Sequence, residues 1–324
     1  MNAAVLNGTS PLKEMASKKP RALIFESVIG VIAPASPGKA DREAAGLEEL
    51  KRLGFQVAQR KAGTSEGYFA GSQVERGLEL TRALANDAVD GVVAVRGGYG
   101  SNYLLDALLA VNLEAPKAIV GFSDLTSLQI YLWQKHAWVS FYGPMVAAGL
   151  DGGAGSSKGY DRESLLAAVG KADGGWKMDL RGEVLGVGEA EGRILGGCMT
   201  LVETSLGTPW ELDTRDAILV LEDRAMKPWQ VDRGLMHLKQ ARKFDEVRGI
   251  VLGDFPECDP PVQGSPTVRD VAQRILGPLG VPIVFGAPVG HTLRPMLTLP
   301  LGVKARLSAK GEGLLEILEP AVVK

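Results

Sequence analysis

The sequence predicts an α/β protein made of two parts. Its 324 residues, of which 45% are hydrophobic, suffice for one large core or for two domains. Short apolar runs alternate with helical patterns in the first half, which is typical of a parallel sheet with helices on both faces. After Pro144 the pattern becomes less regular, so we expect a second part with a more mixed sheet.

The first half alternates between strands and helices from its first apolar run onwards. That run, residues 28–34, is continuously apolar, as in a buried parallel strand, and the turn residues 35–38 end it. Ser72 followed by Glu75 is a capping-box pattern that marks a helix start. The predicted order is strand 28–34, helix 42–53, strand 55–58, helix 72–86, strand 91–95, helix 103–110, strand 118–122 and helix 124–135. In such sheets, ligands bind outside the carboxyl ends of the strands.

The second half contains shorter strand-like segments and three predicted helices. The range 149–160 is rich in Gly, Ser and Asp, so we expect an exposed linker there. Strands are expected at 176–180, 192–195, 218–222, 249–252 and 282–285, and helices at 197–206, 229–240 and 267–276. We therefore divide the chain into a loose extension (1–20), an N-terminal domain (21–148), a linker (149–175) and a C-terminal domain (176–324).

Charge and composition exclude several function classes. The net charge is −2, with 36 basic and 38 acidic residues mixed along the chain, and no basic stretch predicts nucleic-acid binding. The first 21 residues lack the apolar segment of a signal peptide, and no apolar run is long enough to span a membrane. Cys198 and Cys258 form no disulfide framework, so we expect a cytoplasmic protein.

No motif predicts a metal or a nucleotide cofactor. The chain has three histidines, no His-Glu-x-x-His sequence and no cysteine cluster, which are the usual zinc patterns. Gly98 and Gly100 follow a strand, but the third glycine of a dinucleotide fingerprint would fall at Tyr103. A phosphate-binding Gly-Lys-Ser/Thr sequence is absent too. An NAD-dependent enzyme is therefore disfavoured, and we expect neither a metal nor a cofactor.

Ser123 stands at the junction between a predicted strand and a predicted helix. The apolar run ends at Phe122, and the helical pattern begins just after Asp124. A serine in such a turn projects its hydroxyl beside the free amides of the helix start, where the helix dipole favours negative charge. The position suits a serine nucleophile. The alternative is that Ser123 or Asp124 simply caps the helix.

One histidine and one carboxylate occupy positions suited to a base and its partner. His136 and His237 lie within helical patterns, where a histidine among apolar neighbours usually packs or caps. His291 instead follows a strand in a loop rich in Gly and Pro, where catalytic bases are usually held. Glu222 ends an apolar run, and a buried carboxylate there needs a partner such as His291. Asp223 is the alternative, although strand alternation points it the opposite way.

A glycine-rich loop, Arg96-Gly97-Gly98-Tyr99-Gly100, follows the predicted strand 91–95. Glycines let backbone N–H groups approach a ligand closely, so the loop suits an oxyanion-binding site. A tight turn without a ligand is the alternative interpretation.

Six segments of the chain together resemble the LD-carboxypeptidase family of Ser-Glu-His peptidases. They occur in the family's order and span nearly the whole chain. The resemblance implies that Ser123 is the nucleophile, Glu222 the acid and His291 the base. The matching segments are Gly30-Val31-Ile32-Ala33-Pro34-Ala35-Ser36, Val95-Arg96-Gly97-Gly98-Tyr99-Gly100, Gly121-Phe122-Ser123-Asp124, Gly192-Arg193-Ile194-Leu195-Gly196-Gly197, Leu219-Val220-Leu221-Glu222-Asp223, and Gly290-His291 with Leu299-Pro300-Leu301-Gly302.

The resemblance also implies further properties of the site and the fold. The oxyanion donors would be the amide of Asp124 and that of Gly98 or Gly97. The N-terminal domain would be flavodoxin-like or Rossmann-like, and the C-terminal domain a swivelling β/α or small barrel-like unit. The substrate would be a muropeptide or small peptide, cleaved between an L-centre and a terminal D-alanine during cell-wall recycling. Homodimers are usual in the family.

A carboxypeptidase must also bind the carboxylate at the end of its substrate. Backbone amides or an arginine would do so, and the candidate side chains are Arg96 and Arg224, with Tyr99 as a further substrate contact.

Two positions depart from the family pattern. Cys198 stands where many members carry Asn, and Met296 stands where a polar residue is expected. Neither position belongs to the implied triad.

Two other functions are compatible with the same residues. A related self-immunity branch of the family cleaves peptidyl- or aminoacyl-nucleotide antibiotics, and it would stack the adenine on an aromatic side chain. Trp176, Trp210 and Trp229 are candidates, although each also fits a packing role. The alternative from another class is a non-enzymatic two-domain ligand-binding protein of periplasmic type. The missing export signal and the ordered Ser, Glu and His segments count against it.

Overall fold

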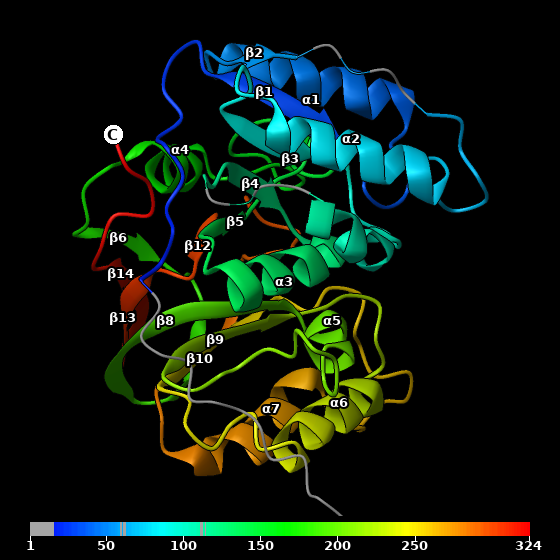
Figure 1. The fold of residues 1–324 in the computed structure, drawn as a ribbon. Helices are drawn as coiled ribbons and strands as arrows, with labels where there is room; N and C mark the ends of the chain where they lie inside the picture. Colours follow the sequence, from blue (N-terminus) through cyan, green and yellow to red (C-terminus); the bar gives the residue numbers. More distant parts are fainter. Residues whose placement is uncertain (1–15, 59, 61–62, 111–112, 114) are drawn as a thin grey trace, which may run out of the picture.

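The computed structural model describes residues 16–324 apart from positions 59, 61–62, 111–112 and 114. Two sheets organise this part of the chain, one in each half, and helices pack around both (Figure 1). The predicted α/β class with two parts is therefore confirmed. The predicted extension, residues 1–20, lies mostly outside the described residues, and the boundaries between the predicted domains stay a prediction.

The first sheet has five parallel strands and one antiparallel edge strand. The four strands predicted for the first half are present, whereas β5 and β12 were not predicted. β12 comes from the C-terminal part of the chain, yet its Leu299 lies opposite Tyr142 of β5. In the order β12-β5-β4-β3-β1-β2, the strands are β12 (Leu299–Leu301), β5 (Ser140–Tyr142), β4 (Ala118–Gly121), β3 (Gly91–Ala94), β1 (Val28–Ile32) and β2 (Gln56–Val57).

Helices connect these strands in the predicted order. The capping box of Ser72 and Glu75 is present at the start of the second helix. The third connection is a 3-10 helix rather than an α-helix, and the fourth begins with one 3-10 turn. The helices are α1 (Ala40–Arg52), α2 (Gln73–Ala85), η1 (Ser101–Ala110), η2 (Ser123–Leu125) and α3 (Thr126–His136). α3 also contacts β8 and α5 of the second half, so it lies between the two sheets (Figure 1).

The second sheet is mixed, with four parallel strands at its centre. The five predicted strands are present, but β8 is much longer than predicted. β7, β13 and β14 were not predicted, although β13 and β14 alternate between buried and exposed residues as half-buried strands do. The order is β6 (Trp176–Asp179), β14 (Glu312–Ile317), β13 (Lys304–Lys310), β8 (Gly188–Cys198), β9 (Ala217–Glu222), β10 (Gly249–Gly253), β11 (Ile283–Ala287) and β7 (Glu183–Gly186).

The helices of the second half lie in three places close to those predicted. α5 (Met199–Thr204) is shorter than the predicted helix 197–206, because β8 continues to Cys198. α6 (Pro228–Gln240) and α7 (Val268–Leu276) pack against each other, and the short 3-10 helix η4 (Gly277–Leu279) follows α7. Together they cover the buried parallel strands, as Figure 1 shows below the second sheet.

The segment expected to be an exposed linker is folded and partly buried. It contains a short 3-10 helix, η3 (Leu150–Gly152), and an α-helix, α4 (Arg162–Gly170). Tyr160 is fully buried, and its hydroxyl donates to Glu49 at 2.8 Å. Two of its glycines are required by close packing, since a Cβ on Gly159 would lie 1.7 Å, and one on Gly152 2.3 Å, from a backbone oxygen. Residues 154, 155, 157 and 158 are exposed as expected, so composition predicted the exposure of this stretch but not the packing around it.

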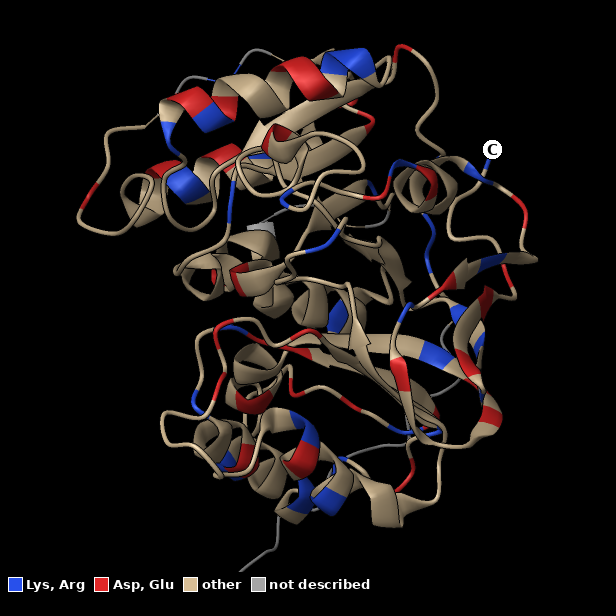
Figure 2. Cartoon of the chain, turned by 180° about the vertical axis from the view of Figure 1, so that it is seen from behind, with Lys and Arg blue, Asp and Glu red and all other residues tan. Residues whose placement is uncertain are grey.

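Charged side chains of both signs are interspersed over both halves of the molecule (Figure 2). Many of them form ion pairs; Arg60, for example, contacts both Glu43 and Glu79 at 2.7 Å. Among the described residues, no helix is long and apolar enough to cross a membrane.

Candidate active site

Ser123 occupies a sharp turn between β4 and the first helical turn of the fourth connection. Phe122 is extended, but Ser123 has a φ of +63°, a left-handed conformation that is strained for a residue with a side chain. Such a strand-to-helix turn presents the serine hydroxyl at the carboxyl end of the sheet. A Cβ on Gly121 would lie 2.3 Å from the side chain of Leu125, so a larger residue before the turn would displace this buried leucine.

The loop after β3 lies against this turn. A Cβ on Gly97 would lie 2.9 Å from Ser123 Oγ and 3.3 Å from the amide nitrogen of Asp124, so the three groups surround one small space. Gly98 has a φ of +107°, and a Cβ there would collide with Ser36 Oγ at 2.2 Å. Ser36 fixes the loop, because its N–H donates to Gly97 O at 3.2 Å and its hydroxyl accepts from Tyr99 N at 3.3 Å.

Asp124 contributes more than its amide. Its carboxylate is buried and accepts a 2.7 Å hydrogen bond from Ser101 N, while the Ser101 hydroxyl donates to Asp124 O at 2.6 Å. Burial raises the pKa of Asp124, against the opposing effect of these hydrogen bonds. The buried Arg76 donates to Gly100 O at 2.8 Å and lies over the Phe69 ring. These contacts hold the glycine loop against the Ser123 turn.

Glu222 and His291 form a direct pair. Glu222 ends β9 and is fully buried. Its Oε2 lies 2.9 Å from His291 Nδ1 and accepts a 2.8 Å hydrogen bond from the His291 backbone N–H. The pair also needs a glycine, because a Cβ on Gly253 would lie 2.5 Å from the Glu222 Cβ. The carboxylate thereby fixes both the backbone and the ring of the histidine.

The environment of His291 favours a basic imidazole beside the Ser123 turn. Burial alone would lower the pKa of His291, but the charge of Glu222 and its hydrogen bond outweigh burial and raise that pKa. The ring packs edge-on against Phe122, the residue before Ser123, with 5.1 Å between ring centroids. Because Nδ1 faces Glu222, Nε2 is the nitrogen left to exchange a proton with a nucleophile or substrate.

Tyr142 is part of this site, and sequence reasoning missed it. Its hydroxyl donates to Glu222 Oε1 at 2.5 Å and accepts from the Ser123 N–H at 3.3 Å. Burial and the charge of Glu222 raise the pKa of Tyr142 well above its usual range, so the phenol keeps its proton. The sequence signal is weak, because a tyrosine in a short apolar run is also an ordinary core residue.

Comparison with known proteins adds independent evidence. Residues 29–143 match the family model for the LD-carboxypeptidase N-terminal domain, and residues 191–307 match the model for its C-terminal domain. The chain belongs to the LD-carboxypeptidase family. The resemblance carried by the six sequence segments is thereby confirmed. The two matched ranges contain every residue of the candidate triad: Ser123 in the first, and Glu222 and His291 in the second.

Relatives in the family differ in what their names describe. The chain is 32% identical over 294 residues to a probable murein peptide carboxypeptidase of Bacillus subtilis, covering 90% of this chain and 91% of the relative. It is 29% identical over 306 residues to the microcin C7 self-immunity protein of Escherichia coli, covering 84% and 87%.

Solved structures of relatives share the two-part fold. The wild-type microcin C7 self-immunity protein in its apo state superimposes with a TM-score of 0.82 at 25% identity, over 93% of this chain and 99% of that one. The muramoyltetrapeptide carboxypeptidase of Oxalobacter formigenes gives a TM-score of 0.79 at 26% identity, over 92% and 100%. Both comparisons cover the N- and C-terminal halves together, so the chain shares its two-part arrangement with both relatives.

The candidate substrate contacts vary in their surroundings. Arg96 is exposed, and its guanidinium lies 3.4 Å from Pro37 O. Arg224 is exposed as well, but it is paired with Glu257. Tyr99 is 41% exposed and contacts a cluster of rings formed by Tyr68, Phe69 and Tyr103. The family match does not assign a ligand to any of these side chains.

The remaining residues singled out in the sequence have structural partners. The hydrogen bonds of Asp223 lead away from His291: its carboxylate accepts from the Thr200 N–H at 3.0 Å and from the Cys198 thiol at 3.5 Å. Burial raises the pKa of the Cys198 thiol well above its usual range. Met296 is buried. His237 Nδ1 lies 2.8 Å from Glu203, away from the candidate triad.

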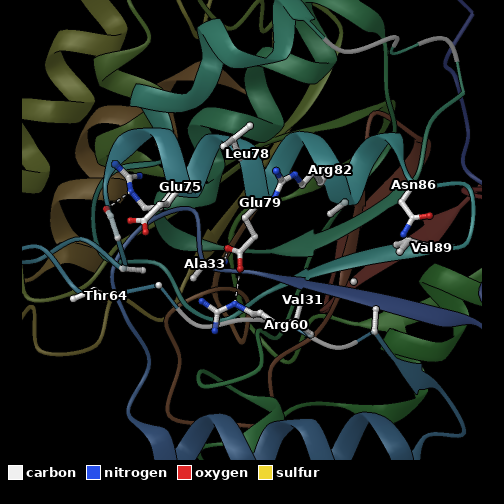
Figure 3. A pocket seen from close by; sticks show the side chains of 17 residues that line it. Val31, Ala33, Arg60, Thr64, Glu75, Leu78, Glu79, Arg82, Asn86 and Val89 are labelled. Atoms are coloured by element: carbon white, nitrogen blue, oxygen red, sulfur yellow. Dashed lines mark hydrogen bonds and ion pairs between the residues drawn. The ribbon is translucent and has the colours of Figure 1, made fainter.

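A cavity of about 520 Å³ lies elsewhere, between α2 and the edge of the first sheet (Figure 3). Its charged side chains largely neutralise each other, since Arg60 contacts Glu79 and the Glu79 carboxylate also accepts from Ala33 N at 2.6 Å. None of the candidate triad lines it.

Across the described residues, no group of three or more His, Cys, Asp or Glu side chains is arranged to hold a metal ion.

Proposed function

We propose that this protein is a serine LD-carboxypeptidase that removes the terminal D-alanine of murein tetrapeptides through an acyl-enzyme. The observation that carries the proposal is the Glu222–His291 pair beside the strained turn of Ser123. Membership of a carboxypeptidase family and the murein peptide carboxypeptidase among the relatives support the substrate class. The family's usual homodimer and a role in cytoplasmic cell-wall recycling belong to the same proposal.

Acylation begins at Ser123. His291 Nε2 removes the hydroxyl proton as Oγ attacks the carbonyl carbon between the L-centre and D-alanine. Glu222 holds Nδ1–H and stabilises the imidazolium that forms, which its 2.9 Å contact permits. The tetrahedral oxyanion then accepts hydrogen bonds from the amides of Asp124 and of Gly98 or Gly97. The loss of one such donor typically costs about 100- to 1000-fold in rate.

Acylation ends when D-alanine leaves, and deacylation then uses the same proton transfers with water. The imidazolium of His291 protonates the leaving nitrogen as the tetrahedral intermediate collapses, and D-alanine departs. A water molecule then loses its proton to Nε2 and attacks the acyl-Ser123 ester. The imidazolium returns a proton to Ser123 Oγ as the ester bond breaks, and the shortened peptide is released. The nucleophile comes from the first half and both other members from the second, so the reaction takes place at the junction of the two halves.

The terminal carboxylate needs a cation or amides near the glycine loop. Arg96 is our preferred partner, because it directly precedes Gly97 and its side chain is exposed. Arg224 already pairs with Glu257, so it would have to exchange that partner. Tyr99 would then contact the part of the peptide beyond the scissile bond. These three contacts stay proposals of lower priority than the triad.

A second function is the hydrolysis of peptidyl- or aminoacyl-nucleotides. The observation that favours it is the similarity to the microcin C7 self-immunity protein, which has been solved in complex with aspartyl sulfamoyl adenosine. Of the three tryptophan candidates, Trp229 is 53% exposed, whereas Trp176 and Trp210 pack against the apolar cores. Trp229 is therefore the tryptophan best suited to stack on a base. The non-enzymatic alternative is disfavoured by the peptidase family.

Three substrates separate these functions. The wild-type enzyme is given the peptide L-Ala-D-Glu-meso-diaminopimelate-D-Ala and the same peptide ending in L-Ala. The third substrate is a cleavable aminoacyl-adenylate surrogate such as a peptidyl adenosine phosphoramidate. Our proposal requires release of D-alanine from the first peptide and much slower release of L-alanine from the second. Cleavage of the nucleotide substrate alone would assign the chain to the self-immunity function.

A further inference from the structure

We infer that Tyr142 is a positioning residue that couples the nucleophile turn of the first half to the carboxylate of the second half through a single hydroxyl group. The inference rests on the roles proposed above for Ser123, Glu222 and His291. It assigns to Tyr142 two tasks: holding the Glu222 carboxylate toward His291, and supporting the strained backbone of Ser123.

The donor and acceptor roles of the hydroxyl are fixed by its partners. A buried carboxylate that pairs with a histidine can only accept, so the phenol proton points to Glu222 Oε1 at 2.5 Å. The oxygen is then free to accept the Ser123 N–H at 3.3 Å. One hydroxyl therefore links β5, the turn after β4 and the end of β9.

The ring of Tyr142 has little freedom to move. It is fully buried and packs edge-on against Phe122, with 6.2 Å between ring centroids. On another side it meets the glycine pair of β8, since a Cβ on Gly197 would lie 3.0 Å from Tyr142 Cε2. A nearby hydrogen bond from Cys198 N to Thr126 Oγ1, at 3.1 Å, joins β8 to the start of α3. The hydroxyl is thus held in a rigid contact between the two halves.

The two carboxylate oxygens of Glu222 have different hydrogen-bond partners. Oε2 receives the backbone N–H and lies closest to Nδ1 of His291, at 2.9 Å, whereas Oε1 receives the Tyr142 hydroxyl and lies 3.2 Å from Nδ1. Without the phenol, Oε1 would lose its shortest hydrogen bond in a fully buried site. An under-satisfied buried carboxylate is costly, so Glu222 would hold the imidazolium of His291 more tightly.

The expected electrostatic effect has a definite sign. The charges of Glu222 and Asp223 favour the imidazolium of His291 and that of Arg224 opposes it, while Tyr142 and Cys198 both lie within the influence of Glu222. The phenol hydrogen bond withdraws charge from the carboxylate. Its removal leaves more of the charge of Glu222 to stabilise the imidazolium, so the pKa of His291 should rise.

The test uses Tyr142→Phe, which keeps the ring and removes only the hydroxyl. The matched control is Tyr160→Phe: Tyr160 is also fully buried, and its hydroxyl also donates to a carboxylate, that of Glu49 at 2.8 Å. The imidazole resonances of the full-length protein are titrated by NMR, with His136 and His237 as internal references. The kcat and KM for tetrapeptide hydrolysis are measured on the same samples.

We expect the titration midpoint of His291 to move upward by about half a pH unit or more in Tyr142→Phe and not in Tyr160→Phe. We also expect kcat to fall about 10-fold or more with little change in KM, because the loss of a hydrogen bond to a charged group acts on the triad and not on substrate binding. An unchanged His291 midpoint together with an unchanged kcat would overturn the inference.

A second replacement keeps the experiment decisive if Tyr142→Phe does not fold. Exchange of Tyr142 for 3,5-difluorotyrosine preserves the shape and makes the hydroxyl a stronger donor, so the His291 midpoint should move downward. A midpoint that stays in place there would contradict the coupling. The NMR readout needs no substrate, so a wild-type enzyme that releases no D-alanine would refute the proposed function and leave the test of Tyr142 intact.

Discussion

Gly290 provides the space that the carboxylate of Glu222 occupies. A Cβ on Gly290 would lie 2.4 Å from the Glu222 Cδ, and Gly290 itself has a φ of +61°. The residue before His291 must therefore be glycine for two independent reasons: its backbone is left-handed, and the neighbouring acid fills the place of a side chain. The contact between Glu222 and His291 therefore depends on the lack of a Cβ at position 290.

We predict that Gly290→Ala separates Glu222 from His291. The clash forces either the carboxylate or the loop to move, so kcat should fall at least about 100-fold and the protein should lose roughly 1–3 kcal/mol of stability. The control is Gly280→Ala, since Gly280 has a similar φ of +69° but no atom within 4 Å of the Cβ position. Equal losses of kcat in the two variants would show that backbone strain, and not the clash with Glu222, causes the loss.

Glu222→Gln and Asp223→Asn distinguish the two neighbouring carboxylates. Glu222 contacts His291, whereas Asp223 accepts from Thr200 and Cys198. We expect Glu222→Gln to lower kcat by about 1000-fold or more, because the amide cannot stabilise the imidazolium. Asp223→Asn should lower kcat less than about 10-fold. Steady-state kinetics of both variants show which carboxylate is the acid of the triad. A larger fall in kcat for Asp223→Asn than for Glu222→Gln would assign that role to Asp223.

The pH dependence of kcat/KM should report His291. Its pKa is raised from the ordinary value of 6.5, and the reaction needs the neutral imidazole as a base. Activity should therefore be lost as the pH falls, with the acidic limb centred above 6.5 in the free enzyme. Glu222→Gln removes the charge that raises this pKa, so burial then dominates and the limb should move to lower pH. A limb that stays fixed would contradict our account of the pair.

Ser36→Ala tests the support of the glycine loop. The Ser36 hydroxyl accepts from Tyr99 N and fills the space beside Gly98. Without this hydroxyl, the glycine loop that supplies an oxyanion donor should be held less firmly. We therefore expect kcat to fall about 10-fold while KM changes little. Ser156→Ala is the control, because that hydroxyl also binds a loop backbone, Gly152 O at 2.7 Å, but in a different segment. A KM effect without a kcat effect would point to substrate binding instead.

The sequence was informative wherever a polar residue interrupts a strong apolar pattern. Ser123 and His291 follow buried strands and Glu222 ends one, and the expected alternation of side chains favoured Glu222 over Asp223. The parallel strands and the Ser72 capping box were predictable for the same local reasons. Local pattern thus indicates which residues stand at strand ends, and the fold class follows from their alternation.

Contacts between distant segments were not predictable from pattern. Tyr142 and Arg76 are of residue types that also occur as ordinary core or surface residues, and only the fold shows that one contacts Glu222 and the other the glycine loop. The pairing of β12 with β5 joins segments more than 150 residues apart. The glycines of 149–160 suggested an exposed linker, and only the fold shows that Gly152 and Gly159 are required by close packing.

The most direct test of the account is release of D-alanine from a purified disaccharide-free tetrapeptide by the wild type and by Ser123→Ala. We predict steady release by the wild type and none above background with the variant, provided that circular dichroism shows both to be folded. Undiminished release by Ser123→Ala would contradict the triad, because hydrolysis would then proceed without the proposed nucleophile.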